Sequence, residues 1–360
     1  MSRRALSGVL AAVVAVVLLV LVGGTVRTPY VAFRPGPTVD VLAGAGGSVV
    51  AVPSRLASPG AGELRLVTVQ VRDRPSVLGA LRGWLRDDVQ VVPRDVQFPP
   101  GTSRDEVREA NEQLFDDSQQ VAVSAAFTWL AAVEGRQSTA VVAGLVDGLP
   151  ADGLLEVDDV VLAVNGEPVD DAGSLVEAVR AREPGDEVDL RVRRGGDVRD
   201  VVVATAESED GGPVVGAQVR TGLADVALGD VEFIAGDIGG PSAGLAYALG
   251  LVDLLSEDVT VDVPLAVTGT ISPTGEVGGI GGVRQKAYGA ARDGAESFLV
   301  PVANCAEVLD DPPAGLGLYA VTDLSDAVDA VAALDRGRRP PTCADAVAAA
   351  RGDAAGPAAG

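Results

Sequence analysis

The chain has 360 residues, a formal net charge of −23 and only 3% aromatic residues. This length has room for two compact domains with an anchor and a tail, around cores of valine, leucine and alanine. The acidic charge argues against nucleic-acid binding, because phosphate groups need clustered lysine and arginine. Histidine is absent, and Lys286 is the only lysine beside 27 arginines.

A long apolar stretch opens the chain. Two arginines precede the run Ala5–Val26, which carries no charge and exceeds the about 20 residues that a helix needs to cross a bilayer. The arginines predict a cytoplasmic tail over residues 1–7, a transmembrane anchor over 8–27 and a cell-membrane location with the remainder outside the cytoplasm. A cleaved signal peptide is the alternative, although the run is longer than a usual signal core and lacks a clean A-x-A site.

The region 28–120 is then expected to be an N-terminal extracytoplasmic part. Within it, Glu63–Val71 alternates polar and apolar residues, as a half-buried strand does. Ser103–Glu106 has the capping-box pattern, which predicts a helix over 103–133.

Residues 121–207 have a different pattern of short strands and turns. A β-branched run is followed by a turn, a strand with an Asn-Gly turn, an amphipathic helix and a closing hairpin. These elements are Thr139–Ala143, Leu149–Gly153, Asp158–Gly166, Ala172–Arg182 and Glu187–Ala204.

This order and these residues resemble a bacterial PDZ domain, with Glu156 where many members carry Gly. The resemblance implies that an extended peptide binds by adding a strand to a sheet edge. The stretch Gly135–Thr139 lacks the usual Gly-φ-Gly-φ pattern of the carboxylate-binding loop. A PDZ fold that serves only as a spacer is therefore the alternative.

The last part of the chain alternates strands and helices over residues 214–335, which indicates an α/β or α+β domain. Residues 336–360 are rich in Pro, Ala and Gly and are expected to form a disordered tail. Cys305 and Cys343 both lie in the external part. They are either a disulfide that ties the tail to this domain or two unrelated thiols.

The sequence Gly239–Gly244 (GGPSAG) is the first motif with chemical meaning. Its G-x-S-x-G core is typical of α/β-hydrolases, but their mechanism needs a histidine base that this chain lacks. Ser242 is expected to begin an apolar helix whose free amides face a developing oxyanion. Pro241 has no N–H, so the expected donors are the backbone amides of Ser242 and of a neighbouring Gly or Ala, with Gly240 and Ala243 as the candidates. A tight turn or a phosphate cradle is the alternative for this motif alone.

A neutral lysine amine can replace histidine as the general base. Its pKa must fall from about 10.4 to about 7–8, a shift of roughly 3 units or ~4 kcal/mol, which burial can supply. Arginine cannot act in this way, because its guanidinium stays protonated. Lys286 is therefore the predicted base for Ser242, with a chance surface lysine as the alternative.

The segment Val267–Lys286 (VTGTISPTGEVGGIGGVRQK) is the second motif, and Lys286 follows Ser242 by 44 positions. Together with GPSAG, it resembles the proteolytic domain of the Lon protease family over roughly residues 228–335. The resemblance implies a serine-type peptidase with a Ser-Lys dyad. It also implies that the hydroxyl of Thr268 orients the lysine amine, whereas an ordinary strand threonine is the alternative.

One position departs from the family pattern. Gly239 stands where many Lon proteases carry Asp, and Asp237 is the nearest carboxylate. An acidic neighbour of the dyad is therefore in doubt. The strand Glu63–Val71 also resembles the start of a Lon catalytic domain, in which case the PDZ domain is an insertion within that domain.

The chain cannot contain a Walker A motif, since its only lysine is followed by Ala287. We therefore expect no use of ATP by the chain itself. No other cofactor and no metal are expected either. The arrangement of anchor, PDZ domain and Lon-like domain resembles the PDZ-containing Lon-like proteases of bacterial membranes. The expected fold is an α/β (α+β) Lon-type proteolytic domain with a PDZ domain and one N-terminal transmembrane helix.

The predicted function is ATP-independent cleavage of unfolded or extended polypeptides outside the cytoplasmic membrane, with the PDZ domain recruiting or gating the substrate. The expected partners are polypeptide substrates and the membrane, through the N-terminal helix, with no nucleic acid. Resemblance also implies a homo-oligomeric ring. The alternatives are an inactive peptide-binding adaptor and an acyltransferase or autoprocessing acyl-enzyme.

Overall fold

Strands from both halves of the chain form one six-stranded mixed sheet, in the order β18-β17-β14-β3-β1-β4. β3, β14, β17 and β18 run parallel, whereas β1 is antiparallel to β3 and β4. The bounds are β1 Tyr30–Asp40, β3 Glu63–Asp73, β4 Gln90–Pro93, β14 Pro264–Val267, β17 Ser297–Pro301 and β18 Gly317–Val321. The computed structural model describes residues 3–42, 50–53, 57, 62–99, 101–208, 210–224, 226, 231–234, 240–256 and 258–354.

The side chains of these strands alternate between two hydrophobic cores, as the period of two requires. Leu265 and Val267 of β14 face one core, and Ala266 between them faces the other. The first core is closed by α3 (Arg104–Glu134), α5 (Gly244–Leu255) and α8 (Leu324–Asp335). The second is closed by α6 (Val283–Arg292), α7 (Cys305–Leu309) and α9 (Cys343–Ala354). The sheet is thus the middle of three layers, and helices on opposite faces can meet only beyond the end of a strand.

Short elements complete this part of the chain. The helical segments are α1 Arg3–Thr25, α2 Val77–Trp84, η1 Arg94–Val96, η3 Pro241–Ala243 and η4 Val302–Asn304. Two strand pairs lie outside the large sheet: β2 (Val50–Ala51) with β13 (Glu232–Phe233), and β15 (Thr270–Ile271) with β16 (Val277–Gly278).

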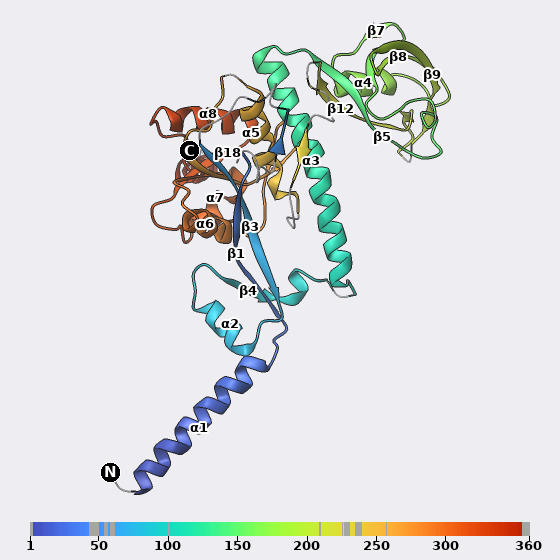
Figure 1. The fold of residues 1–360 in the computed structure, drawn as a ribbon. Coiled ribbons are helices and arrows are strands. Elements are labelled where there is room, and N and C mark those ends of the chain that lie inside the picture. The colour runs from blue at the N-terminus through green and yellow to red at the C-terminus, as the bar shows by residue number, and fades with distance from the viewer. Residues whose placement is uncertain are drawn as a thin grey trace, which may run out of the picture.

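A second sheet has the order β12-β5-β6-β8-β9 and packs with α4 (Ala172–Arg180) around its own core. Its bounds are β5 Ser138–Leu145, β6 Val160–Val164, β8 Glu187–Arg194, β9 Asp197–Ala204 and β12 Ala217–Leu223. β7 (Glu167–Pro168) pairs with β6, and β10 (Ala206–Glu207) pairs with β11 (Pro213–Val214). This unit lies at the far end of α3, apart from the large sheet (Figure 1).

The boundaries of this second unit differ from the predicted 121–207. The expected start falls inside α3, where Ala126, Phe127 and Leu130 are buried in the core of the large sheet. The expected end omits β12, which pairs with β5 along its whole length. The apolar spacing of α3 is the same whichever body it packs against, so the sequence pattern could not place the boundary.

The second unit interrupts the large sheet in sequence. β3 precedes it and β14 follows it, yet the two strands pair in parallel from Glu63 to Leu66. The six-stranded sheet therefore includes the strand that was predicted to begin the catalytic domain.

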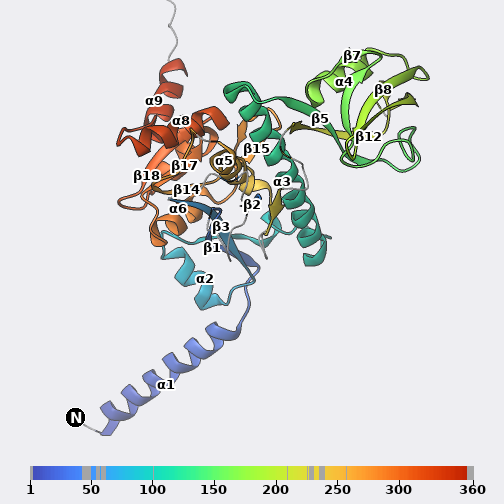
Figure 2. The ribbon, with the colours of Figure 1, turned by 45° about the horizontal axis from the view of Figure 1, so that its top comes forward.

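The first helix, α1, projects away from the large sheet (Figures 1 and 2). Among the residues searched, which are the described ones, no helix has the length and apolar content that a bilayer crossing requires. The predicted transmembrane anchor over 8–27 thus finds no support here. The side chains of residues 1–12 and 15, on which part of that prediction depends, lie outside the described residues.

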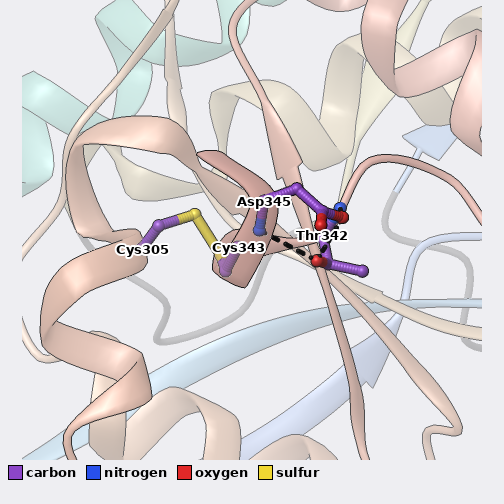
Figure 3. Close-up of a disulfide and its surroundings, with 4 residues drawn as sticks. All are labelled: Cys305, Thr342, Cys343 and Asp345. Atoms are coloured by element: carbon purple, nitrogen blue, oxygen red, sulfur yellow. Dashed lines mark hydrogen bonds between the residues drawn. A yellow bond between two sulfur atoms is a disulfide. The ribbon is translucent and has the colours of Figure 1, made fainter. Parts of the chain in front are cut away.

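The predicted disordered tail contains α9, which Figure 3 shows tied to α7 by a disulfide between Cys305 and Cys343. Thr342 and Asp345 close the first turn of α9: the Asp345 N–H donates to Thr342 Oγ1 (3.1 Å) and the Thr342 N–H donates to Asp345 Oδ2 (3.0 Å). The expectation of disorder up to residue 354 was wrong, because composition alone does not register a cross-link and a capped helix start. Residues 355–360 lie outside the described part.

Candidate active site

Ser242 lies in η3, directly before α5 on one face of the sheet, and Lys286 lies on α6, on the other face. The two meet beyond the carboxyl end of β14, where Thr268 follows the last strand residue. Nζ of Lys286 is 2.7 Å from Oγ of Ser242 and 2.9 Å from Oγ1 of Thr268. The structure therefore brings all three predicted side chains together.

Thr268 also fixes the backbone of the serine. Its hydroxyl donates to the Ser242 carbonyl (3.2 Å), and the N–H of Gly269 donates to the same oxygen (3.1 Å). Since the Thr268 hydroxyl has one proton and gives it to that carbonyl, it accepts a hydrogen bond from the lysine amine. This arrangement sets the direction of the amine as well as its distance from Ser242.

The surroundings of Lys286 favour its neutral form. The side chain is 3% exposed, and this burial lowers the pKa of its amine to about 7. Desolvation penalises the ammonium, which carries charge, far more than the amine. Asp237 and Gly239, the positions at which an acidic neighbour was considered, lie outside the described residues.

Helix α6, which carries Lys286, has Gly282 as its N-cap residue. Gly282 has a left-handed backbone (φ 68°). A Cβ added at Gly282 would lie 2.9 Å from a methyl group of Val69 on β3. Both the conformation and the close approach require glycine. Lys286, one turn later, donates its N–H to the Gly282 carbonyl (3.0 Å), so this glycine helps to set where the amine emerges.

Of the two backbone amides predicted to bind the oxyanion, one is already used in another hydrogen bond. The N–H of Gly240 donates to the carbonyl of Asn111 on α3 (3.1 Å), so that amide is already used and the prediction for Gly240 is wrong in this conformation. Gly240 has a positive φ of 92°, a backbone conformation that favours glycine. Ala243, inside η3, is the remaining candidate of the pair.

A cleft of ≈1480 Å³ opens over Ser242 and Lys286. One wall is β3 from Leu66 to Asp73, and another is the first half of α3, with side chains at helical spacing from Val107 to Gln119. Gly279–Gly281 forms the rim in front of α6. The sequence patterns did not predict that α3 lines the site.

Asn304 is a second residue that sequence reasoning missed. It is buried behind the rim, and its side-chain amide makes two hydrogen bonds to the backbone of Ile280. A side chain that binds only backbone leaves no partner pattern in a sequence, so no signal could have found it.

The PDZ-like unit has a groove of its own, ≈510 Å³ and mostly apolar. It lies between α4, through Leu175 and Val179, and the segment 213–219, which contains the start of the edge strand β12. The groove therefore uses residues beyond the predicted end at 207, and Gly135–Thr139 does not line it.

Residues 234–333 match the family model of the Lon protease (S16) C-terminal proteolytic domain, and residues 130–205 match that of the PDZ domain. The chain carries a Lon-type proteolytic domain and a PDZ domain. A Lon protease from Frankia alni is 43% identical over 95 residues, which are 25% of this chain and 10% of that protein. Lon protease 1 from Herpetosiphon aurantiacus is 47% identical over 75 residues, 21% of this chain and 9% of that protein.

The chain thus spans about a tenth of the length of these relatives. Among solved structures, the PDZ domain of the SdrC-like protein from Listeria innocua aligns with 22% of this chain and 92% of that structure, at 17% identity and a TM-score of 0.22. The Lon-type match includes Ser242, Thr268 and Lys286, so the three clustered side chains belong to the proteolytic domain.

Proposed function

We propose that this chain is an ATP-independent serine endopeptidase in which Ser242 is the nucleophile and Lys286 the general base. The observation that carries the proposal is the buried amine of Lys286, 2.7 Å from the serine oxygen and with a pKa lowered to about 7. An amine with this pKa is partly neutral at neutral pH and can accept the serine proton.

In both half-reactions Nζ of Lys286 accepts a proton from the attacking group and returns it to the leaving group. Oγ of Ser242 attacks the peptide carbonyl carbon while its proton moves to Nζ of Lys286. Backbone N–H groups at the start of α5, with Ala243 as the candidate, hold the oxyanion. As the C–N bond breaks, Nζ returns the proton to the leaving amine. Water then attacks the acyl-serine ester while Nζ takes its proton; as the ester bond breaks, Nζ returns that proton to Oγ of Ser242 and the carboxylic acid product leaves.

The proposed substrate is an unfolded or extended polypeptide. β14 pairs with β3 only as far as Leu66, so among the described strands none covers that edge of β3 from Val67 to Asp73. This open edge lines the cleft, and an extended chain can add to it through backbone hydrogen bonds. The PDZ groove also lies beside an open strand edge, that of β12. We propose that it recruits or gates the substrate.

Cleavage of casein by the full chain tests this function, with Ser242→Ala, Lys286→Met and Lys286→Arg as variants. Arg284→Lys, on the same helix, is the matched control, because it adds an amine without placing it at the serine. We expect cleavage by the parent and by Arg284→Lys alone. Equal cleavage by Lys286→Arg would disprove the proposed base.

The same experiment separates the alternatives. An inactive adaptor would bind casein and cleave nothing in any oligomeric state. An acyltransferase or autoprocessing enzyme would accumulate a covalent adduct on Ser242 without turnover of added protein. Addition of ATP is expected to leave the rate unchanged.

We also propose a homo-oligomeric ring and a location outside the cytoplasm in contact with the membrane. The disulfide supports the location, since such bonds persist in oxidising compartments. Sedimentation of the detergent-solubilised chain tests the ring, and protease accessibility in intact and permeabilised cells tests the location.

A further inference from the structure

Helix α2 turns an apolar face to the outside. Its small residues Ala80 and Gly83 are buried, whereas Val77, Leu81, Trp84 and Leu85 are 43%, 48%, 55% and 78% exposed. The spacing i, i+4, i+7, i+8 places these four on one stripe, which in a globular protein normally faces the core. The stripe therefore needs a cover from outside the described chain.

This stripe continues into α1. The N–H of Val77 donates to the Val26 carbonyl and the N–H of Thr28 donates to the Pro75 carbonyl, both at 3.0 Å. These bonds hold the start of α2 against the end of α1, where Val22 and Val26 are also about half exposed. Figures 1 and 2 show both helices at the same end of the molecule, away from the PDZ domain.

The charge at this end is opposite to that of the remaining chain. The first 90 residues contain ten arginines and five acidic residues, whereas the other 270 contain 18 basic and 46 acidic residues. Arg27, Arg74 and Arg82 are exposed and flank the apolar stripe in sequence, and Arg86 is exposed as well but pairs with Asp88 (2.6 Å). An exposed apolar stripe with flanking arginines fits a membrane surface, in which anionic headgroups cover apolar acyl chains.

A second copy of the chain fits this face less well. A symmetric dimer places the same patch on both partners, so it would oppose arginine to arginine at the edge of the apolar contact. Phosphate groups of lipids offer the complementary charge, and the acyl boundary offers the apolar cover.

We propose that α2, with the adjacent end of α1, docks on an anionic lipid surface. Val77, Leu81, Trp84 and Leu85 enter the boundary between headgroups and acyl chains, and the arginines pair with lipid phosphates. Docking through α2 is separate from any binding by α1 alone and from the proposed catalytic function. It would hold the large sheet at a defined height and orientation at the membrane surface.

Trp84 provides a direct reporter of this docking. The chain has two tryptophans, and Trp129→Phe leaves Trp84 as the only indole. The full chain, diluted from detergent, is mixed with vesicles of phosphatidylcholine alone or with phosphatidylglycerol, with and without bromine on the acyl chains. We expect Trp84 emission to move to shorter wavelength and to be quenched by bromine, most strongly with phosphatidylglycerol.

Two pairs of substitutions test the two parts of the face. Leu81→Ser with Leu85→Ser should remove the shift of Trp84 even where α1 still holds the chain on vesicles. Arg82→Gln with Arg86→Gln should weaken the response to anionic vesicles by about tenfold or more. Val198→Ser with Val202→Ser, two exposed residues of the PDZ domain, is the matched control and should change nothing. Circular dichroism checks that each variant is folded.

Three results would overturn the proposal. Vesicle-bound chain with unchanged Trp84 emission would mean that α1 alone binds. A shift that depends on protein concentration and not on vesicles would identify a second copy as the cover. An equal change of Trp84 emission with both vesicle compositions, in the parent and in the arginine variants, would exclude a preference for anionic lipid.

Discussion

The side-chain amide of Asn304 holds both polar backbone groups of Ile280: Oδ1 accepts the Ile280 N–H (2.8 Å) and Nδ2 donates to the Ile280 carbonyl (2.9 Å). Ile280 is the middle residue of the rim Gly279–Gly281, which lines the cleft in front of Lys286. Asn304 thus makes the two hydrogen bonds that a neighbouring strand would otherwise make to Ile280. These bonds order a glycine-rich segment whose backbone is flexible by itself.

Asn304→Ala should therefore leave the dyad intact but loosen the rim. We expect kcat/KM for casein to fall about tenfold, mainly through KM, with little change in its pH dependence, because the hydrogen bonds of Asn304 go to Ile280 and not to Ser242, Thr268 or Lys286. Asn304→Asp keeps only the acceptor for the Ile280 N–H, so its kcat/KM should lie between those of the parent and of Asn304→Ala. Thr342→Ala, which disturbs the start of α9 without touching the rim, is the control; an equal loss there would indicate general destabilisation.

The pKa of Lys286 sets the expected pH profile. Burial lowers it to about 7, and only the neutral amine can take the serine proton. The value of kcat/KM should therefore rise with pH through about 7 and level off above it. A profile that falls over this range would contradict the role of a neutral lysine. Lys286→Arg should lower kcat/KM at least about a hundredfold at every pH, since its guanidinium stays protonated.

Thr268 should act through the lysine. Thr268→Val removes one of two partners from each of two buried groups: Nζ of Lys286 keeps only Oγ of Ser242, and the Ser242 carbonyl keeps only the Gly269 N–H. The loss of these two buried hydrogen bonds should cost about 1–3 kcal/mol. We expect kcat to fall about tenfold or more and the midpoint of the pH profile to move. Thr268→Ser restores the hydroxyl and should recover most of the rate. A Val variant as active as the Ser variant would reduce Thr268 to a packing residue.

The proximity of Ser242 and Lys286 could be predicted because the composition of the chain left few alternatives. A chain with one lysine and no histidine can offer Ser242 a single side-chain amine, although 44 positions separate the two. The presence of β3 in the same sheet as β14 agrees with the resemblance of Glu63–Val71 to the start of a Lon catalytic domain. The use of Gly240 could not be predicted, because its positive φ and its bond to Asn111 depend on where α3 packs.

The tail could not be predicted for a related reason. An alanine-rich segment such as α9 is ordered only if something holds it, and here Cys343 is bonded to Cys305, 38 residues earlier. Cys305→Ser with Cys343→Ser should release α9, which limited proteolysis would detect as cleavage near residue 343. Closing a loop of this length stabilises a fold by about 2–4 kcal/mol, so the variant should also unfold at lower urea concentration. Unchanged proteolysis would show that packing alone holds the helix.

A second ionisable group is buried near the end of α5. Asp253 is 0% exposed; its Oδ1 accepts the Val261 N–H (2.6 Å), and its Oδ2 has no hydrogen-bond partner among the described residues. Burial raises the pKa of this carboxyl to about 7, against the effect of the Val261 bond, and the carboxylates of Asp262, Asp335 and Asp40 add to the rise.

This carboxyl should make stability depend on pH. The unfolded chain releases the proton near pH 3.8 and the folded chain near pH 7, so the folded state binds more protons in between. The free energy of unfolding should therefore fall as pH rises from about 4 to about 7, by up to ~4 kcal/mol. Asp253→Asn keeps the shape and the Val261 bond and should lose this slope. Urea midpoints measured across this range on the Ser242→Ala background avoid self-digestion. Asp262→Asn, at an exposed neighbour, should keep most of the slope; an unchanged slope in Asp253→Asn would assign it to other groups.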